Sequence, residues 1–249
     1  GGSGISYAEF SYTLIQGYDF LHLFREHNVT LQLCGADQFG NCTSGIHLIS
    51  RLENATADCY SCPLIIDKVT GRKFGKSEGN AVWLDANKTS IFDFYQFWLN
   101  QSDEALEDYF KYFTFVTPEE LDKILSRHRE NPGARYGQAR LAELVTAIVH
   151  GEDAATAAKK ITAIVFGDGK LTDLSTDEVE LFAKSFPTAT FGSLIDILVA
   201  TGLASSKGEA RKLIAGNAIS INGQKVTADQ AISELSLIKK GKNKFALVR

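Results

Sequence analysis

The chain has 249 residues, of which 44% are hydrophobic and 22% are charged, and its formal net charge is −4. A chain of this length can bury sizeable cores, so we expect two or three structural units. It holds no apolar run long enough to cross a bilayer, which excludes a membrane-spanning protein.

The first expected element is a helix over residues 8–24. Tyr12, Gln16 and Asp19 are spaced i, i+4 and i+7, so their side chains fall on one face of this helix. A phenol, an amide and a carboxylate occupy a stripe where core residues are expected, and polar groups are costly to bury unless they are paired. The stripe therefore indicates a site for a polar ligand.

A β-rich run at residues 29–33 leads into the loop Gly35-Ala36-Asp37-Gln38. Parallel α/β sheets place ligand-binding loops after their strands. Here Gly35 would allow a sugar to approach closely, and Asp37 could accept hydrogen bonds from ribose hydroxyls. Taken alone, the segment is equally typical of an ordinary strand-to-helix turn with an aspartate N-cap.

The most informative stretch is the polar loop Lys73-Phe74-Gly75-Lys76-Ser77, which follows the apolar run at residues 63–66. Its ammonium groups could bind a polyphosphate, with the glycine allowing close backbone approach. It is not a P-loop, because that motif requires a second glycine five residues before the lysine. Read alone it is typical of a solvated turn, and only the upstream segments favour a catalytic role.

The four cysteines are Cys34, Cys42, Cys59 and Cys62. The last two have C-x-x-C spacing, but Cys34 and Cys42 do not form the second close pair that a zinc knuckle needs. Reduced thiols in a cytosolic protein are the better interpretation, so we expect no structural metal.

The middle of the chain is expected to be helical. One helix begins with Thr117 as N-cap, Pro118 at N1 and Glu120 at N3, and ends at Asn131. Further helices are expected over residues 90–99, 103–112, 134–149 and 153–165. The ten aromatic residues between Phe92 and Phe115 are expected in the core rather than as a base-stacking platform.

After a linker at residues 186–188, Ser206 and Glu209 form a predicted capping box, and Asn222-Gly223 predicts a type I′ hairpin turn. Residues 190–249 hold nine Lys or Arg against four Asp or Glu, whereas residues 1–189 hold 17 against 26. A basic terminal segment on an acidic body indicates a polyanionic partner.

Together, in this order, these segments resemble the bacterial-type tyrosyl-tRNA synthetases of class I. The resemblance rests on residues 5–20, the loop at 35–41, the lysine loop and residues 81–85, and extends to the end of the chain. It implies an α/β fold: residues 1–88 as the second half of a Rossmann-like nucleotide-binding catalytic domain, 89–186 as an α-helical anticodon-recognition domain, and 187–249 as a small α+β S4-like RNA-binding domain.

The resemblance implies roles for the matching residues. Tyr12 and Gln16 would hold the α-ammonium group of L-tyrosine, and Asp19 would accept its phenolic hydrogen bond. Gln32 would lie at the pocket edge, and Gln38 would contact the amino-acid or carboxylate end of the adenylate. The residues implied in ATP and ribose binding are Gly35, Asp37 and Lys76.

Lys73, Lys76 and the Ser77 hydroxyl would stabilise charge on the pyrophosphate leaving group, with Mg²⁺ accompanying ATP. Catalysis would then consist of positioning and electrostatic stabilisation. The residues expected to contact tRNA(Tyr) are Lys207, Arg211, Lys212, Lys239, Lys240, Lys242 and Lys244.

The family's H-x-G-H signature does not occur around any of the five histidines. We therefore expect this chain to be the C-terminal part of a longer enzyme, inactive or nearly so alone, with the upstream half supplying most of a homodimer interface. Residues 1–4 (Gly-Gly-Ser-Gly) are either a flexible loop or a cloning remnant. The expected location is the cytoplasm, with an organellar matrix as the alternative.

Two other interpretations stay open. A tryptophanyl-tRNA synthetase would share the fold and the lysine loop, although Tyr12, Gln16 and Asp19 suit a phenol. A non-catalytic RNA-binding protein, of the kind that assists splicing, would explain the basic tail but would not need an amino-acid pocket.

Overall fold

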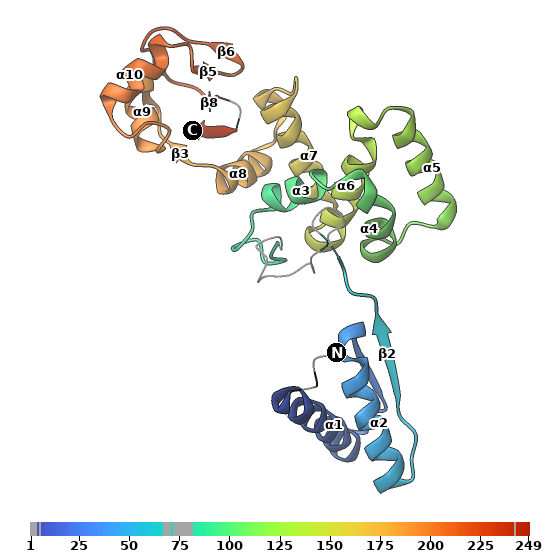
Figure 1. Ribbon diagram of the computed structural model, residues 1–249. Helices are drawn as coiled ribbons and strands as arrows, with labels where there is room; N and C mark the ends of the chain where they lie inside the picture. The colour runs from blue at the N-terminus through green and yellow to red at the C-terminus, as the bar shows by residue number, and fades with distance from the viewer. Residues whose placement is uncertain (1–3, 5, 67–70, 72–81, 242) are drawn as a thin grey trace. The chain divides into compact units, whose positions relative to one another are not determined.

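The computed structural model describes residues 4, 6–66, 71, 82–241 and 243–249. The chain divides into two compact units, Gly1–Ala81 and Val82–Arg249 (Figure 1). The lysine loop with Lys73, Lys76 and Ser77, and also Lys242, lie outside the described residues. Within the described residues, no helix has the length and apolar character needed to cross a membrane.

The first unit is a β-α-β arrangement preceded by a long helix. Its elements are α1 (Tyr7–His27), β1 (Leu31–Gly35), the 3₁₀ turn η1 (Ala36–Gln38), α2 (Phe39–Glu53) and β2 (Asp58–Cys62). β1 and β2 are parallel, which requires a crossover connection, and α2 supplies it. The strand expected at residues 29–33 is confirmed with a shift of two residues.

The expected N-terminal helix is confirmed as α1. A capping box begins it, because Ser6 accepts from the Glu9 N–H while the Glu9 carboxylate accepts from the Ser6 N–H. Asn28 ends it in the left-handed conformation, with φ of 55°. The short polar side chain of asparagine tolerates this conformation better than most residues.

Two glycines let α1 and α2 pack closely. A Cβ atom on Gly45 would lie 2.8 Å from the Phe20 ring, and one on Gly17 would lie 2.9 Å from the Ser44 hydroxyl. Phe20, together with Leu21, Ile49 and Ala57, forms the buried core of this unit. This crossing fixes which face of α1 meets the start of α2.

The second unit begins with a helical bundle. Its elements are α3 (Ile91–Leu99), η3 (Asp103–Ala105), α4 (Leu106–Phe113), α5 (Pro118–Glu130), η4 (Pro132–Ala134), α6 (Tyr136–His150), α7 (Glu152–Phe166), η5 (Leu171–Asp173) and α8 (Thr176–Ser185). The predicted capping box of α5 is confirmed, with Thr117 accepting from Glu120. Most of the predicted core aromatics are buried, but Tyr112 is exposed and Phe115 is 91% exposed, so the prediction is wrong for these two.

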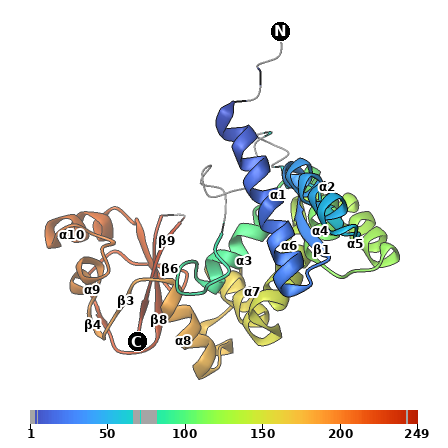
Figure 2. The ribbon, with the colours of Figure 1, turned by 90° about the horizontal axis from the view of Figure 1, so that it is seen from below.

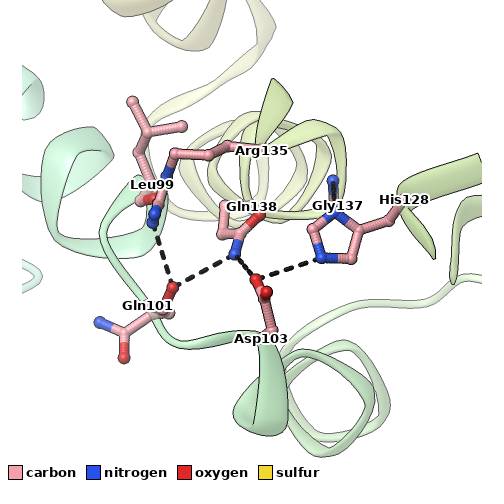
Figure 3. A network of polar contacts seen from close by, with 7 residues as sticks. All are labelled: Leu99, Gln101, Asp103, His128, Arg135, Gly137 and Gln138. Atoms are coloured by element: carbon pink, nitrogen blue, oxygen red, sulfur yellow. Dashed lines mark hydrogen bonds and ion pairs between the residues drawn. The ribbon is translucent and has the colours of Figure 1, made fainter. Parts of the chain in front are cut away.

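A polar network around the buried side chains of His128 and Gln138 joins the helices of this bundle (Figure 3). The Gly137 N–H donates to His128 Nδ1 at 3.4 Å, so Nε2 carries the proton and donates to Asp103 Oδ1 at 3.1 Å. Gln138 Nε2 donates to the same oxygen at 2.5 Å. Arg135 donates to the carbonyl oxygens of Leu99 and Gln101. The network therefore ties the segment between α3 and α4 to α5 and α6.

The end of the chain adds two short helices and a sheet. The elements are β3 (Thr188–Ala189), β4 (Gly192–Ser193), α9 (Leu194–Ala200), α10 (Lys207–Ala215), β5 (Ile219–Ile221), β6 (Gln224–Lys225), β7 (Ala231–Ile232), β8 (Ser236–Lys240) and β9 (Lys244–Val248). The main sheet has the order β3-β9-β8-β5-β6. Asn222 and Gly223 both have positive φ, 47° and 83°, which agrees with the predicted type I′ turn.

The two faces of this sheet bury different cores (Figure 2). Ala246 and Val248 face α9 and α10, whereas the alternate residues Phe245 and Leu247 share a core with Phe92 of α3 and with residues of α7 and α8. Phe186, expected in a linker, packs with its ring centroid 4.9 Å from that of Phe92 and 5.9 Å from that of Phe245. That segment is therefore part of a core, and the mixed α/β character expected from the sequence is present.

Candidate functional site

The polar face of α1 meets the loop that follows β1 through one side chain, that of Asn41. Its amide nitrogen donates to Gln16 Oε1 at 3.2 Å and to Gln38 Oε1 at 3.0 Å. Thr13 Oγ1 donates to Asn41 Oδ1 at 2.7 Å. Two of the predicted tyrosine-binding residues, from α1 and η1, are thus brought together by a residue in the first turn of α2.

The loop after β1 is a compact turn at Gly35 and Asp37. A Cβ atom on Gly35 would lie 2.9 Å from Asp37 Oδ1 and 3.4 Å from Leu64, so a larger residue would displace the carboxylate. Asp37 itself is exposed at the start of η1. The carboxylate therefore stands directly over the glycine at the carboxyl end of β1.

The other predicted tyrosine-binding residues differ in their surroundings. Tyr12 and Asp19 are exposed, and neither makes a hydrogen bond within the part of the chain that is described. Gln32 is half-buried, and its Oε1 has no hydrogen-bond partner among the described residues. A buried amide oxygen without a partner is costly, so a polar group supplied from outside this set would stabilise it.

Sequence reasoning identified Gln16 and Gln38 but did not assign a role to Asn41 or Thr13. The available signal was spacing: Asn41 follows Gln38 by three residues, one helical turn, and Thr13 precedes Gln16 by three. Polar residues one turn from a predicted ligand contact are candidates to hold that contact in place. The three-residue spacing identifies both Asn41 and Thr13.

The predicted RNA-binding residues gather around α10 and the β8–β9 hairpin. Arg211, Lys212 and Lys244 are exposed. Lys207 is also exposed but forms an ion pair of 2.7 Å with Asp196. Arg211 and Lys212 therefore supply most of the positive charge on the helix that begins after Ser206.

Two lysines of the predicted set make internal contacts. Lys240 Nζ donates to the Leu203 carbonyl at 2.7 Å and pairs with Glu209 at 3.1 Å. Lys239 Nζ lies 5.2 Å from the centroid of the Phe245 ring, in a cation–π contact. These two side chains join β8 to its neighbours and present less free charge than Arg211 or Lys212.

The cap of α10 differs from the predicted capping box. Ser206 accepts from the Glu209 N–H as expected, but the Glu209 carboxylate accepts from the N–H and hydroxyl of Ser205 instead of Ser206. Hydrogen bonds from Ser205, followed by that from Lys240, lower the pKa of Glu209 to about 2. The extended backbone at Ser206 carries its N–H away, which leaves Ser205 as the nearer donor.

Comparison with known proteins identifies the family of this chain. Residues 1–167 match the family "tRNA synthetases class I (W and Y)", and the chain belongs to this family of tryptophanyl- and tyrosyl-tRNA synthetases. Residues 178–249 match the "Tyrosine--tRNA ligase SYY-like C-terminal domain". The resemblance noted from the sequence motifs is therefore confirmed.

The similar proteins are tyrosine–tRNA ligases. The chain is 44% identical to that of Anaeromyxobacter dehalogenans over 99% of its own length, and 46% identical to that of Leuconostoc citreum over 98%. It spans 62% of the length of each relative.

Two solved structures resemble it, both C-terminally truncated mitochondrial tyrosyl-tRNA synthetases. The protein from Coccidioides posadasii gives a TM-score of 0.51 at 30% identity, covering 64% of this chain and 46% of that one. The protein from Aspergillus nidulans gives 0.52 at 31% identity, covering 66% and 46%.

Proposed function

We propose that this chain is the C-terminal part of a tyrosyl-tRNA synthetase, which activates L-tyrosine with ATP and transfers it to tRNA(Tyr). The observation that carries the proposal is the Gln16–Asn41–Gln38 hydrogen-bond network. It holds the polar face of α1 against the loop after β1, so an amino acid on α1 and a nucleotide on the loop would adjoin. Neighbouring elements would then supply the amino-acid part and the nucleotide part of an adenylate site.

On this proposal Tyr12 and Gln16 bind the α-ammonium group of tyrosine and Asp19 accepts the phenolic hydrogen bond. The exposure of Tyr12 and Asp19 supports this assignment, since neither side chain is committed to a partner in the described structure. Gln32 lines the pocket edge, where its unpartnered amide oxygen would gain a donor. Gln38 contacts the adenylate.

The nucleotide is assigned to Gly35 and Asp37, with the ribose hydroxyls donating to the carboxylate. Lys73, Lys76 and Ser77 are proposed to neutralise the pyrophosphate as it leaves, in the presence of Mg²⁺. This step needs positive charge beside the leaving group and no covalent enzyme intermediate, because the tyrosine carboxylate attacks the α-phosphate directly. The chain's own residues thus position the substrates and stabilise the charge on the pyrophosphate, and ATP supplies the leaving group.

For the RNA, we propose that residues 89–186 recognise the anticodon region and that residues 187–249 form an S4-like module. The helix α10 followed by the β5–β6 hairpin supports the second assignment, as does the exposed charge of Arg211, Lys212 and Lys244. Phosphate contacts would supply most of the affinity and make it depend on salt.

Residues 1–88 are proposed as the second half of the catalytic domain, completed by an upstream half that also supplies the homodimer interface. Parallel sheets are normally covered on both faces. On the β1–β2 pair, Leu33 is 70% exposed and Tyr60 is 63% exposed, which supports covering by further polypeptide. Such an enzyme would act in the cytoplasm or an organellar matrix.

Tyrosine-dependent ATP–pyrophosphate exchange tests the proposal. The chain is assayed alone and after mixing with a separately produced upstream half, with tryptophan replacing tyrosine as the specificity control. We expect exchange only in the mixture and only with tyrosine. Exchange with tryptophan, or no exchange in a mixture that forms a complex, would contradict the assignment.

A further inference from the structure

Three of the four cysteines come together in the first unit, although the sequence places them on three different elements. Cys34 lies on β1, Cys59 on β2 and Cys42 in α2. Their sulfur atoms all lie within 4.8 Å of one another, and the Cys34 and Cys59 sulfurs are 3.7 Å apart. Cys62 is exposed and stands outside this trio.

The strand register explains the gathering. In the parallel pair, Cys34 is opposite Ser61 and Cys59 is opposite Gln32, so the two cysteines are diagonal neighbours. Alternation along each strand leaves these residues half-buried while Leu33 and Tyr60 are exposed on the other face. Cys42, fully buried in the first turns of α2, meets them from above the sheet.

The 3.7 Å spacing of the Cys34 and Cys59 sulfurs is that of two thiolates on one metal ion, and the Cys42 sulfur lies within 4.8 Å of both. Sulfurs bound to one ion at about 2.3 Å lie roughly 3.8 to 4.0 Å from each other, for tetrahedral and trigonal geometry respectively. We propose that Cys34, Cys42 and Cys59 form a three-thiolate site for a soft metal ion, Cu(I) or Zn(II). Thiolate ligands select these ions over the hard cations that accompany ATP.

The number of donors decides which ion fits the trio. The trio offers three donors, which suits three-coordinate Cu(I). Zn(II) would require a fourth donor, which a water molecule could supply.

A bound ion would act on the candidate active site. Cys34 directly precedes Gly35, and Cys42 directly follows Asn41. Joining the three sulfurs would fix the end of β1 to the start of α2, which are the two segments that carry the nucleotide loop and the Asn41 network. The site itself does not depend on the proposed function and is tested by binding.

Equilibrium dialysis of the reduced protein under anaerobic conditions tests the site. Zn(II) is used in one arm, and in the other Cu(I) buffered by a chelator that holds the monovalent state. We expect one ion per chain in at least one arm, lost in C34S and in C59S and retained in C62S. Retention of the ion in C34S and C59S, or binding of neither ion by the parent protein, would overturn the proposal.

Thiol labelling of the unsubstituted protein provides a second readout that no folding defect can confuse. Iodoacetamide labelling is followed at each cysteine by mass spectrometry, with and without the ion. Ligation should slow the labelling of Cys34 and Cys59 by at least about tenfold, because it removes the free thiolate, while Cys62 is unaffected. Equal rates at Cys34 and Cys59 with and without a saturating ion would also overturn the proposal.

Discussion

The side-chain amide of Asn41 donates to Gln16 on the neighbouring helix at 3.2 Å, and the same nitrogen donates to Gln38 at 3.0 Å. One amide nitrogen has two hydrogens, so both are committed. Neither glutamine can rotate away without leaving a donor on Asn41 unpaired. The position of both proposed substrate contacts therefore depends on a residue that is not itself proposed to touch tyrosine.

Replacing Asn41 with alanine should weaken tyrosine binding by the complete enzyme. Loss of the two donors frees Gln16 and Gln38, and we expect a cost of about 1 to 3 kcal/mol. Pyrophosphate-exchange kinetics should show a higher KM for tyrosine with a smaller change in kcat. The control is T43A, on the same helix, whose hydroxyl donates to the Gly40 carbonyl. Equal KM values for N41A and T43A would contradict the positioning role.

Substituting Gly45 with alanine should destabilise the first unit, because the new Cβ would lie 2.8 Å from the Phe20 ring. Overpacking of this kind costs about 1 to 3 kcal/mol. Gly40, on the same helix, supplies the matched control G40A, since its added methyl group would meet no heavy atom within 4 Å among the described residues. Urea unfolding should give a lower midpoint for G45A than for G40A, and equal midpoints would refute the close packing of α1 and α2.

Replacing His128 with alanine should destabilise the helical bundle. The substitution removes one donor from the exposed Asp103 and leaves the buried Gly137 N–H without its acceptor, and an unsatisfied buried group costs about 1 to 3 kcal/mol. Thermal unfolding by circular dichroism measures the loss. R129A, one position further on the exposed face of α5, is the control and should change little. A similar melting temperature for both variants would mean that the network does not contribute.

The depressed pKa of Glu209 predicts a specific dependence of stability on pH. The folded pKa is about 2 and the unfolded value is near 4.5, so the stabilisation is complete above pH 4.5 and is lost as the pH falls towards 2. The stability difference between the parent protein and E209Q should be constant near neutral pH and shrink over that acid range. Denaturant unfolding at several pH values measures it, with E130Q as the control. A difference that grows as the pH falls would contradict the assignment.

Reversing the charges of Lys207 and Arg211 should weaken tRNA binding by the complete enzyme without changing tyrosine activation. Each lost phosphate contact reduces the magnitude of the negative slope of log affinity against log salt concentration by about one. Filter binding across a salt series measures the slope, and pyrophosphate exchange monitors activation. K184E, an exposed charge reversal on α8, shows the effect of a single charge reversal outside α10. Unchanged tRNA affinity in the double variant would contradict the assignment of RNA binding to α10.

Local signals predicted the local structure well. The capping residues Thr117 and Ser206 and the Asn222-Gly223 turn act over a few neighbouring residues, so their partners are fixed by the backbone alone. The cysteine trio was missed because its members meet only through a strand register and a helix crossing. C-x-x-C spacing drew attention to Cys62, which the strand alternation turns to the exposed side.

The same limit applies to the candidate site and to the end of the chain. Spacing placed Tyr12, Gln16 and Asp19 on one face, but it could not show that Asn41 would hold Gln16. Glu209 was predicted to bond Ser206, and the choice of Ser205 depends on one backbone turn. Phe186 was interpreted as part of a linker because Pro187 follows it, whereas its ring packs against that of Phe92, which lies far earlier in the chain.

Strand β9 determines how the second unit unfolds. Its alternate residues complete two separate cores, Ala246 and Val248 in one and Phe245 and Leu247 in the other. Slippage by a single residue would exchange the contents of both cores at once. This short strand therefore joins the helical bundle and the terminal sheet into one cooperative unit. Local unfolding of β9 should destabilise α3 and α10 together.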